Sequence, residues 1–138
     1  MIIQLNDQQN VIAKPEDVYA ILQAVLAAED TVDRAKEHCW IFQLNARLRI
    51  QALELVSLGT LDANLVHPRE VFTRAVANRC HRVLIAHNHP SDLVSPSPED
   101  VELTKRLVHA GDILGIALVD HIIIGESSFL SMKQEGLI

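Results

Sequence analysis

Two histidines that follow an apolar segment are the residues whose types and spacing could do chemistry. Arg82 is followed by four apolar residues, 83–86, and residues 82–86 are therefore predicted to form a buried strand. His87 and His89 come directly after this segment. Side chains two positions apart in a strand point to the same side, so both imidazoles can meet just beyond the strand. Asp100 follows in the first turn of a predicted helix. Two imidazoles and one carboxylate suit a catalytic zinc ion, which keeps its fourth position for water.

A zinc-bound water also requires a base that does not itself bind the metal, and the sequence offers two acidic candidates. Glu54 lies among apolar residues of a predicted strand, where a lone buried carboxylate is costly. Facing a metal site would give that charge a partner, so we expect Glu54 to be the general acid/base. Glu70 lies in the first turn of a predicted helix, where the helix dipole favours acidic residues, and we interpret it as structural.

Ser97 and Asp100 each have a structural interpretation beside the functional one. Ser97 precedes Pro98 and suits the N-cap of a helix, whereas its catalytic role would be to donate its hydroxyl to a developing oxyanion. Asp100 occupies the partner position of a capping box. The spacing of His87 and His89 alone also fits ordinary buried histidines, so these alternatives stay open at the level of single residues.

Alternating helices and strands are predicted around these groups. Periodicity and turn residues predict helices over about 15–29, from 68 onward and over 98–110, the last ending at Gly111. They predict strands over 39–44, 49–58, 82–86, 116–124 and 129–131, with residues 30–37 as a linker. This order predicts an α/β fold with a mixed sheet covered by helices on both faces. We expect one domain over residues 1–138, with the metal-site core at about 38–131.

Composition and charge exclude several classes of protein. The chain has 138 residues, of which 49% are hydrophobic and 22% charged, as in a globular domain rather than a disordered one. A net charge of −6 and 4% aromatic residues argue against direct DNA binding. The sequence lacks a signal peptide pattern and an apolar run of about 20 residues, so we expect a cytoplasmic protein without a membrane span. Cys39 and Cys80 are expected to be buried, reduced thiols.

The candidate residues together resemble the signature of the JAMM, or MPN, metalloproteases. That signature is carried here by Glu54, His87, His89, Ser97 and Asp100. Flanking segments are similar to the bacterial RadC family over most of the chain, from about residue 15 onward: GTL at 59–61, VHPREVF at 66–72, LIAHNHPS at 84–91 and DHIIIG at 120–125. The resemblance implies a three-layer α/β/α fold of the cytidine-deaminase-like type. It also implies zinc bound by His87, His89 and Asp100, Glu54 as general acid/base, and Ser97 as the oxyanion-stabilising serine.

The function that this resemblance implies is zinc-dependent hydrolysis, by a peptidase or isopeptidase in a family associated with DNA repair. Its substrate would be a protein or peptide that the sequence does not identify. The alternative is a non-enzymatic, zinc-stabilised interaction module in DNA repair or mobile-element biology, which a closed site with four protein ligands would favour. A nucleobase deaminase would instead carry His-x-Glu and Pro-Cys-x-x-Cys, and neither occurs.

Two departures from the family pattern bear on these expectations. Asp92 stands where RadC-like proteins usually carry glycine, in the loop expected over the site. Longer RadC proteins also have an N-terminal helix-hairpin-helix region that would bind DNA, and we expect none here.

The remaining polar candidates lie outside the signature. Asp120 and His121 are neighbours in a predicted strand and point to opposite faces, so one of them could orient a zinc-binding histidine through its other ring nitrogen. The alternative is a polar residue hydrogen-bonded within the sheet. His67 is expected to begin a helix, and three further histidines are expected to be solvated: His38, His81 and His109.

Overall fold

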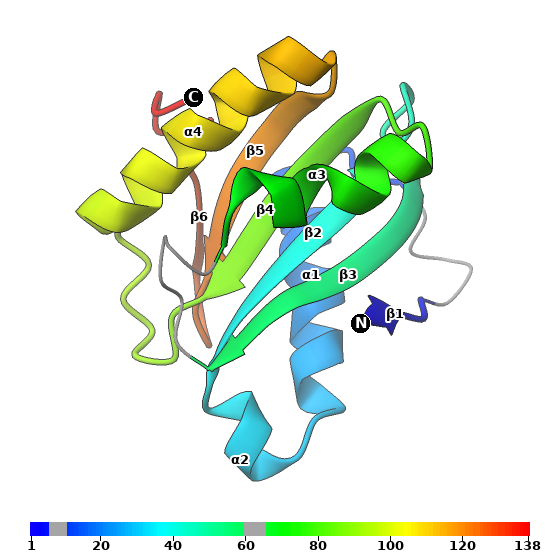
Figure 1. The fold of residues 1–138 in the computed structure, drawn as a ribbon. Coiled ribbons are helices and arrows are strands. Elements are labelled where there is room, and N and C mark those ends of the chain that lie inside the picture. Colours follow the sequence, from blue (N-terminus) through cyan, green and yellow to red (C-terminus); the bar gives the residue numbers. More distant parts are fainter. Residues whose placement is uncertain (6–10, 60–65) are drawn as a thin grey trace.

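A mixed β-sheet forms the middle layer of the molecule in a computed structural model, which describes residues 1–5, 11–59 and 66–138 (Figure 1). In these residues the sheet has six strands in the order β1-β3-β2-β4-β5-β6, of which only β4 and β5 pair in parallel. The strands are β1 (Ile2–Ile3), β2 (Glu37–Leu44), β3 (Ile50–Gly59), β4 (Arg82–Asn88), β5 (Ala117–Ile124) and β6 (Phe129–Ser131). The helices are α1 (Pro15–Ala27), α2 (Thr31–Arg34), α3 (Pro68–Ala77) and α4 (Pro98–Leu114).

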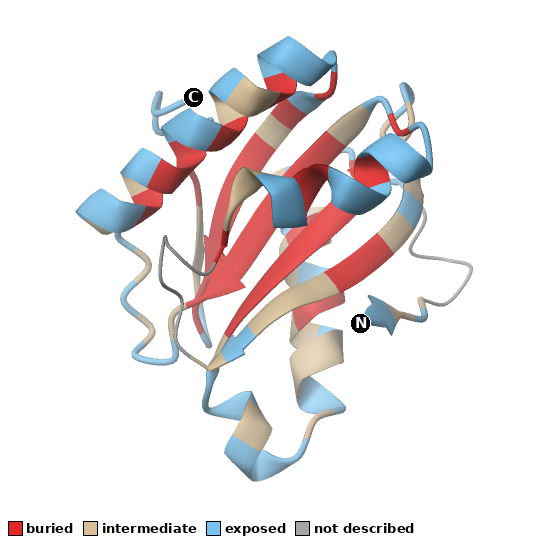
Figure 2. Cartoon of the chain, viewed as in Figure 1, coloured by how far each residue is buried: buried red, intermediate tan, exposed pale blue. Residues whose placement is uncertain are grey.

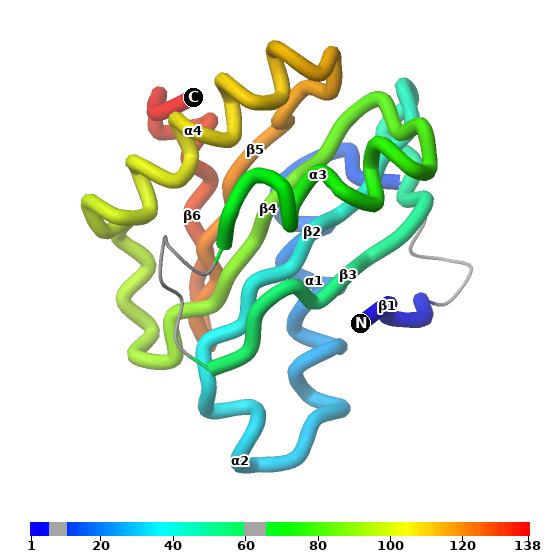
Figure 3. The backbone as a smooth tube through the Cα atoms, in the orientation of Figure 1, coloured from blue at the N-terminus to red at the C-terminus, as the bar shows by residue number. Residues whose placement is uncertain are grey.

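Helices cover both faces of this sheet, as predicted (Figures 1 and 3). Two buried apolar clusters lie between the layers, and the central strands β2, β4 and β5 are buried over most of their length (Figure 2). One cluster joins the sheet to α3 and α4 through residues that include Ile41, Val71, Phe72, Ile85 and Leu103. The other joins the sheet to α1 through residues that include Val18, Leu22, Trp40, Phe42 and Ile122. The structure therefore confirms an α/β fold with a single mixed sheet.

The last helix continues beyond its predicted end. Gly111 was expected to terminate it, but the helix runs to Leu114 and ends at Gly115, whose φ of 73° is the left-handed conformation that glycine adopts readily. Gly111 has a packing role instead. A Cβ atom there would lie 2.3 Å from the carbonyl oxygen of Ile116, so only glycine lets the following chain pass this close to the helix.

The segment predicted as a linker, residues 30–37, is more ordered than expected. Asp30 accepts a hydrogen bond from the Asp33 amide (2.8 Å) and caps the short helix α2, and β2 already begins at Glu37. The prediction that His38 is solvated is also wrong. Its ring is fully buried, stacks on Trp40, and has its Nε2 atom 2.6 Å from a carboxylate oxygen of Glu29.

Other expectations of local structure agree with the structure. His81 and His109 are exposed, and His67 caps α3 by accepting a hydrogen bond from the Arg69 amide (3.1 Å). Cys39 and Cys80 are buried and free. Strand β1 was not predicted, and residues 60–61 of the RadC-like segment lie outside the described residues. None of the described helices is long and apolar enough to cross a membrane.

Candidate metal centre

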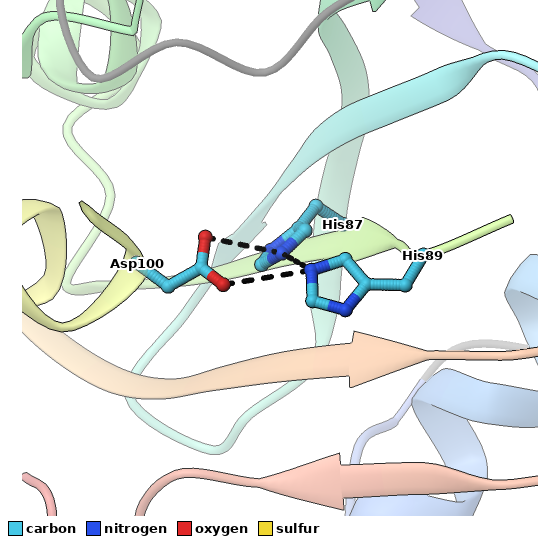
Figure 4. A group of neighbouring side chains, drawn as sticks. All are labelled: His87, His89 and Asp100. Carbon is cyan, nitrogen blue, oxygen red and sulfur yellow. Dashed lines mark hydrogen bonds and ion pairs between the residues drawn. The ribbon is translucent and has the colours of Figure 1, made fainter. Parts of the chain in front are cut away.

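His87, His89 and Asp100 meet where the end of β4 faces the start of α4 (Figure 4). The Nε2 atoms of the two imidazoles are 2.9 Å apart. One carboxylate oxygen of Asp100 lies 3.3 Å from Nε2 of His87, and the other lies 3.5 Å from Nε2 of His89. Ligand atoms of a tetrahedral zinc ion, each about 2.0–2.1 Å from the metal, are separated by about 3.3 Å. The spacing of these three groups therefore fits a zinc ion.

The local structure explains why the three side chains converge. His87 lies near the end of β4. His89 follows just beyond the strand, and its amide extends the pairing with β5 by donating to the Ile124 carbonyl (2.8 Å). Asp100 is fixed by the capping box of α4, in which its carboxylate accepts from the Ser97 amide (2.9 Å). A strand end and a capped helix start thus position the ligand atoms.

Hydrogen bonds set which nitrogen of His87 faces the centre. The Thr104 hydroxyl lies 2.7 Å from the Asp100 carbonyl, and when it donates a hydrogen bond there, its oxygen accepts one from Nδ1–H of His121 (2.5 Å). The Nε2 atom of His121 is then an acceptor for Nδ1–H of His87 (2.7 Å). Burial lowers the pKa of His121, which keeps this ring neutral. This series of hydrogen bonds leaves the lone pair on Nε2 of His87 directed at the other two ligands.

His89 is oriented by a backbone carbonyl. Its Nδ1 atom donates to the carbonyl oxygen of Leu93 (2.6 Å), which leaves Nε2 for the metal. The Asp100 carboxylate, as a hydrogen-bond acceptor for the protonated ring, raises the pKa of His89. Burial raises the pKa of Asp100, but the two facing imidazoles outweigh burial and hold that pKa well below its ordinary value. The carboxylate is therefore ionised, as a metal ligand must be.

Ser97 caps α4 and also lies beside the cluster. Its hydroxyl oxygen accepts from the Asp100 amide (3.0 Å). A hydroxyl has one proton and two lone pairs, and this cap uses only a lone pair. In the described part of the chain no acceptor is assigned to the proton, so capping leaves the donor that an oxyanion would require.

Glu54 is not brought to the cluster. Its carboxylate is 8% exposed and pairs with Arg74 of α3, so its charge has a partner that does not involve a metal. Glu54 lies opposite Ile41 in the sheet register, and Ile41 lies opposite Ile85, two residues before His87. Glu54 and Glu70 both line a cavity between β3 and α3, and none of the three clustered ligands lines it. The acid/base role expected of Glu54 therefore stays a prediction, and it would require Glu54 to leave its ion pair with Arg74.

Glu37 is an acidic residue near His89 that the sequence analysis did not single out. Cys39 lies opposite His87 in the β2–β4 register, and continuing that register by two residues places Glu37 opposite His89 on the same face. Asn88 holds this start of β2 in place, because its side chain accepts from the His38 amide (2.5 Å) and donates to the Lys36 carbonyl (3.1 Å). The charge of Glu37 contributes to the raised pKa of His89.

Asp120 and His121 point to opposite faces, as their adjacent positions predicted. His121 contacts the ligand His87, whereas the Asp120 carboxylate accepts from the Ser131 hydroxyl (2.5 Å) and the Lys133 amide (3.0 Å) near the C-terminus. Thr104 lies within the helix predicted over residues 98–110, and its contact with His121 arises from the packing of α4 on β5.

Comparison with known proteins gives consistent matches along the chain. The sequence model described as "RadC-like JAB domain" matches residues 12–137. A UPF0758 protein of Desulforudis audaxviator is 43% identical over 129 residues, which cover 94% of this chain and 54% of that protein. A UPF0758 protein of Methanococcoides burtonii is 40% identical over 133 residues, which cover 96% of this chain and 56% of that protein. The chain thus spans about half the length of these curated relatives.

Proposed function

This chain belongs to the RadC-like JAB domain family, within the JAMM superfamily, and from that premise we propose that it is a zinc-dependent peptidase or isopeptidase. The observation that carries the proposal is the convergence of His87, His89 and Asp100, which bring two imidazole nitrogens and a carboxylate close enough to share one ion. Three protein ligands are typical of catalytic zinc, whereas structural zinc usually has four.

A bound zinc ion supplies Lewis acidity and lowers the pKa of a coordinated water towards about 7. The chain supplies the ligands and their orientation. His121 and the Leu93 carbonyl each accept a hydrogen bond from Nδ1–H of a ligand histidine, so both Nε2 lone pairs stay available. Asp100 contributes the negative charge, held in one rotamer by the cap of α4.

We assign proton transfer to Glu37 rather than to Glu54. Two observations support this choice: extending the β2–β4 register two residues beyond the Cys39–His87 pair puts Glu37 opposite His89, and the charge of Glu37 contributes to the raised pKa of His89. From there a carboxylate can take a proton from the attacking water and deliver it to the leaving amine. Glu54 is held by Arg74 beneath α3, and moving it to the ligands would break that ion pair.

Ser97 is the residue best placed to stabilise negative charge on the substrate. Its hydroxyl oxygen is fixed by the Asp100 amide, and its proton can be given to an oxyanion that develops near the ligands. A cavity of about 330 Å³ adjoins His89 and Pro90 and reaches the end of α1 at Leu26 and Ala27. We propose that this cavity receives a side chain of a peptide substrate.

The experiment combines metal analysis with a cleavage screen on peptide and isopeptide libraries. The wild-type chain should bind one zinc ion and cleave at least one library member. Glu37→Gln should retain zinc and lose cleavage, whereas Glu54→Gln, the matched control, should retain both in whatever fraction stays folded. His87→Ala should lose zinc.

Two results would contradict this assignment. A folded wild-type chain that binds no zinc would exclude the metal centre. Zinc binding by a fourth protein ligand, with no cleavage in the screen, would favour the non-enzymatic interaction module instead.

A further inference from the structure

Asp92 occupies the turn between β4 and α4 in a backbone conformation that favours glycine. Its φ is 65°, and its amide closes the turn by donating to the His89 carbonyl (2.9 Å). Aspartate is among the few other residues that tolerate this conformation, but glycine would adopt it without strain. The contacts of the Asp92 side chain must therefore offset this backbone strain.

The carboxylate of Asp92 joins this turn to the turn between β5 and β6. It accepts hydrogen bonds from the Ser127 hydroxyl (2.7 Å) and from the Ser127 amide (3.2 Å). These hydrogen bonds, with the hydroxyl contributing most, lower the pKa of Asp92 and keep it ionised. A Cβ atom on Gly125 would lie 2.1 Å from the Asp92 carboxylate, so the two turns approach this closely only because residue 125 is glycine.

The same two turns provide the acceptors for two hydrogen bonds of His89, one from its ring and one from its amide. Its Nδ1 atom donates to the carbonyl of Leu93, the residue directly after Asp92. Its amide donates to the carbonyl of Ile124, the residue directly before Gly125. The contact between Asp92 and Ser127 thus connects the two turns that hydrogen-bond to His89.

We propose that Asp92 is a positioning residue for the metal centre. By tying the β4–α4 turn to the β5–β6 turn, it keeps the Leu93 carbonyl where it can hold His89 with Nδ1 protonated and Nε2 facing the other ligands. The inference rests on the proposed function, because it concerns the orientation of His89 as a zinc ligand. Residues that orient a metal ligand typically change metal affinity about 10–100-fold when they are removed.

The test uses the whole 138-residue chain with zinc alone as the ligand. Asp92→Gly keeps the backbone conformation and removes the carboxylate. It should weaken zinc affinity about tenfold in a competition titration with a chelating dye. In the zinc-free protein, long-range ¹H–¹⁵N NMR should show a mixture of His89 tautomers in place of the Nδ1-protonated form. Asp92→Asn, which keeps an oxygen for Ser127, should restore most of both properties.

Two further variants separate this role from general effects on folding. Ser127→Ala removes only the hydroxyl donor and should weaken zinc affinity by less than Asp92→Gly does. Arg79→Gly makes the same backbone change at another residue with positive φ (55°), before the opposite end of β4, and should leave zinc affinity and the His89 tautomer unchanged.

The outcomes for the two proposals are distinguishable. Wild-type zinc affinity together with an Nδ1-protonated His89 in Asp92→Gly would overturn the positioning role. A wild-type chain that binds no zinc would overturn the proposed function and the role of Asp92 toward the metal. The tautomer comparison in the zinc-free chain would then still decide whether Asp92 controls His89.

Discussion

Replacing Thr104 by valine should damage the metal centre without touching a ligand. Thr104 is 1% exposed, and its hydroxyl oxygen accepts the Nδ1 proton of His121. Valine has nearly the same shape but leaves this buried N–H without a partner, which costs about 1–3 kcal/mol. Unfolding entropy of about 2.1 cal/mol/K per residue gives roughly 0.29 kcal/mol/K for 138 residues. The zinc-free Tm should therefore fall by roughly 3–10 °C.

The effect on zinc follows from the same chain of hydrogen bonds. Once His121 has no acceptor at Nδ1, its favoured tautomer places the proton on Nε2, which then faces the Nδ1 proton of His87. His87 must lose that hydrogen bond or move its own proton to Nε2, the atom that binds the metal. We expect Thr104→Val to weaken zinc affinity at least tenfold, or by about 1.4 kcal/mol.

The assay is a chelator competition titration, run beside thermal unfolding of the zinc-free protein. Thr104→Ser is the matched control, because it keeps the hydroxyl and loses only a methyl group, so its zinc affinity should stay near that of the wild type. Equal zinc affinity in Thr104→Val and Thr104→Ser would refute the argument that this hydrogen-bond chain fixes the tautomer of His87.

Four other predictions follow from the same structure. Zinc at about 100 times its Kd should stabilise the chain against denaturant by about 2.7 kcal/mol, and a chelator should reverse the gain; no change with zinc would exclude binding to the folded state. Zinc affinity should fall as pH is lowered, because Asp100 raises the pKa of His89 and protons then compete for its Nε2 atom at a higher pH than for an ordinary imidazole. Titrations at several pH values that gave one constant affinity would contradict this. Cys39 should resist a thiol-specific reagent until the protein unfolds, because burial raises its pKa and blocks access; rapid labelling of the native chain would show that the strand opens. Gly111→Ala should destabilise the chain by about 1–3 kcal/mol in denaturant unfolding, since the added methyl group would overlap the Ile116 carbonyl, and a stabilised variant would disprove that contact.

The three proposed ligands could be found from the sequence because their signals are local. His87 and His89 are two residues apart at the end of an apolar strand, and periodicity alone places both on one side. The position of Asp100 relative to Ser97 marks a helix start, so the connection back to the strand end is short. No long-range packing has to be known to bring these residues together.

Glu37 and Thr104 could not be found in the same way, because tertiary structure places them. The pairing of β2 with β4 brings the charge of Glu37 near His89, and the packing of α4 on β5 sets Thr104 beside His121. A signal for Glu37 was nevertheless present. Alternate residues from Glu37 through Cys39 and Ile41 share one face of β2, but charged residues before Cys39 suggested a linker and hid the true start of the strand.

The catalytic role of Glu54 stays a prediction, although its charge already has a partner in the structure. A buried carboxylate does require compensation, and the structure provides it through Arg74, which is twenty positions away in sequence and one helix away in space. Sequence alone does not show which cation or metal will neutralise a buried acid, because ion pairs and metal sites satisfy the same requirement.

The structural and functional interpretations of Ser97 and Asp100 turn out to describe the same hydrogen bonds. The capping box holds the Asp100 carboxylate through the Ser97 amide, and this leaves its oxygens facing the two imidazoles. The Ser97 hydroxyl uses a lone pair for the cap and retains a proton for chemistry. A helix start of this kind is therefore a means of fixing a ligand rotamer in advance. It follows that substitutions at Ser97 should change the geometry of Asp100 as well as oxyanion stabilisation, so a loss of activity in Ser97→Ala identifies a catalytic hydroxyl only if zinc affinity is unchanged.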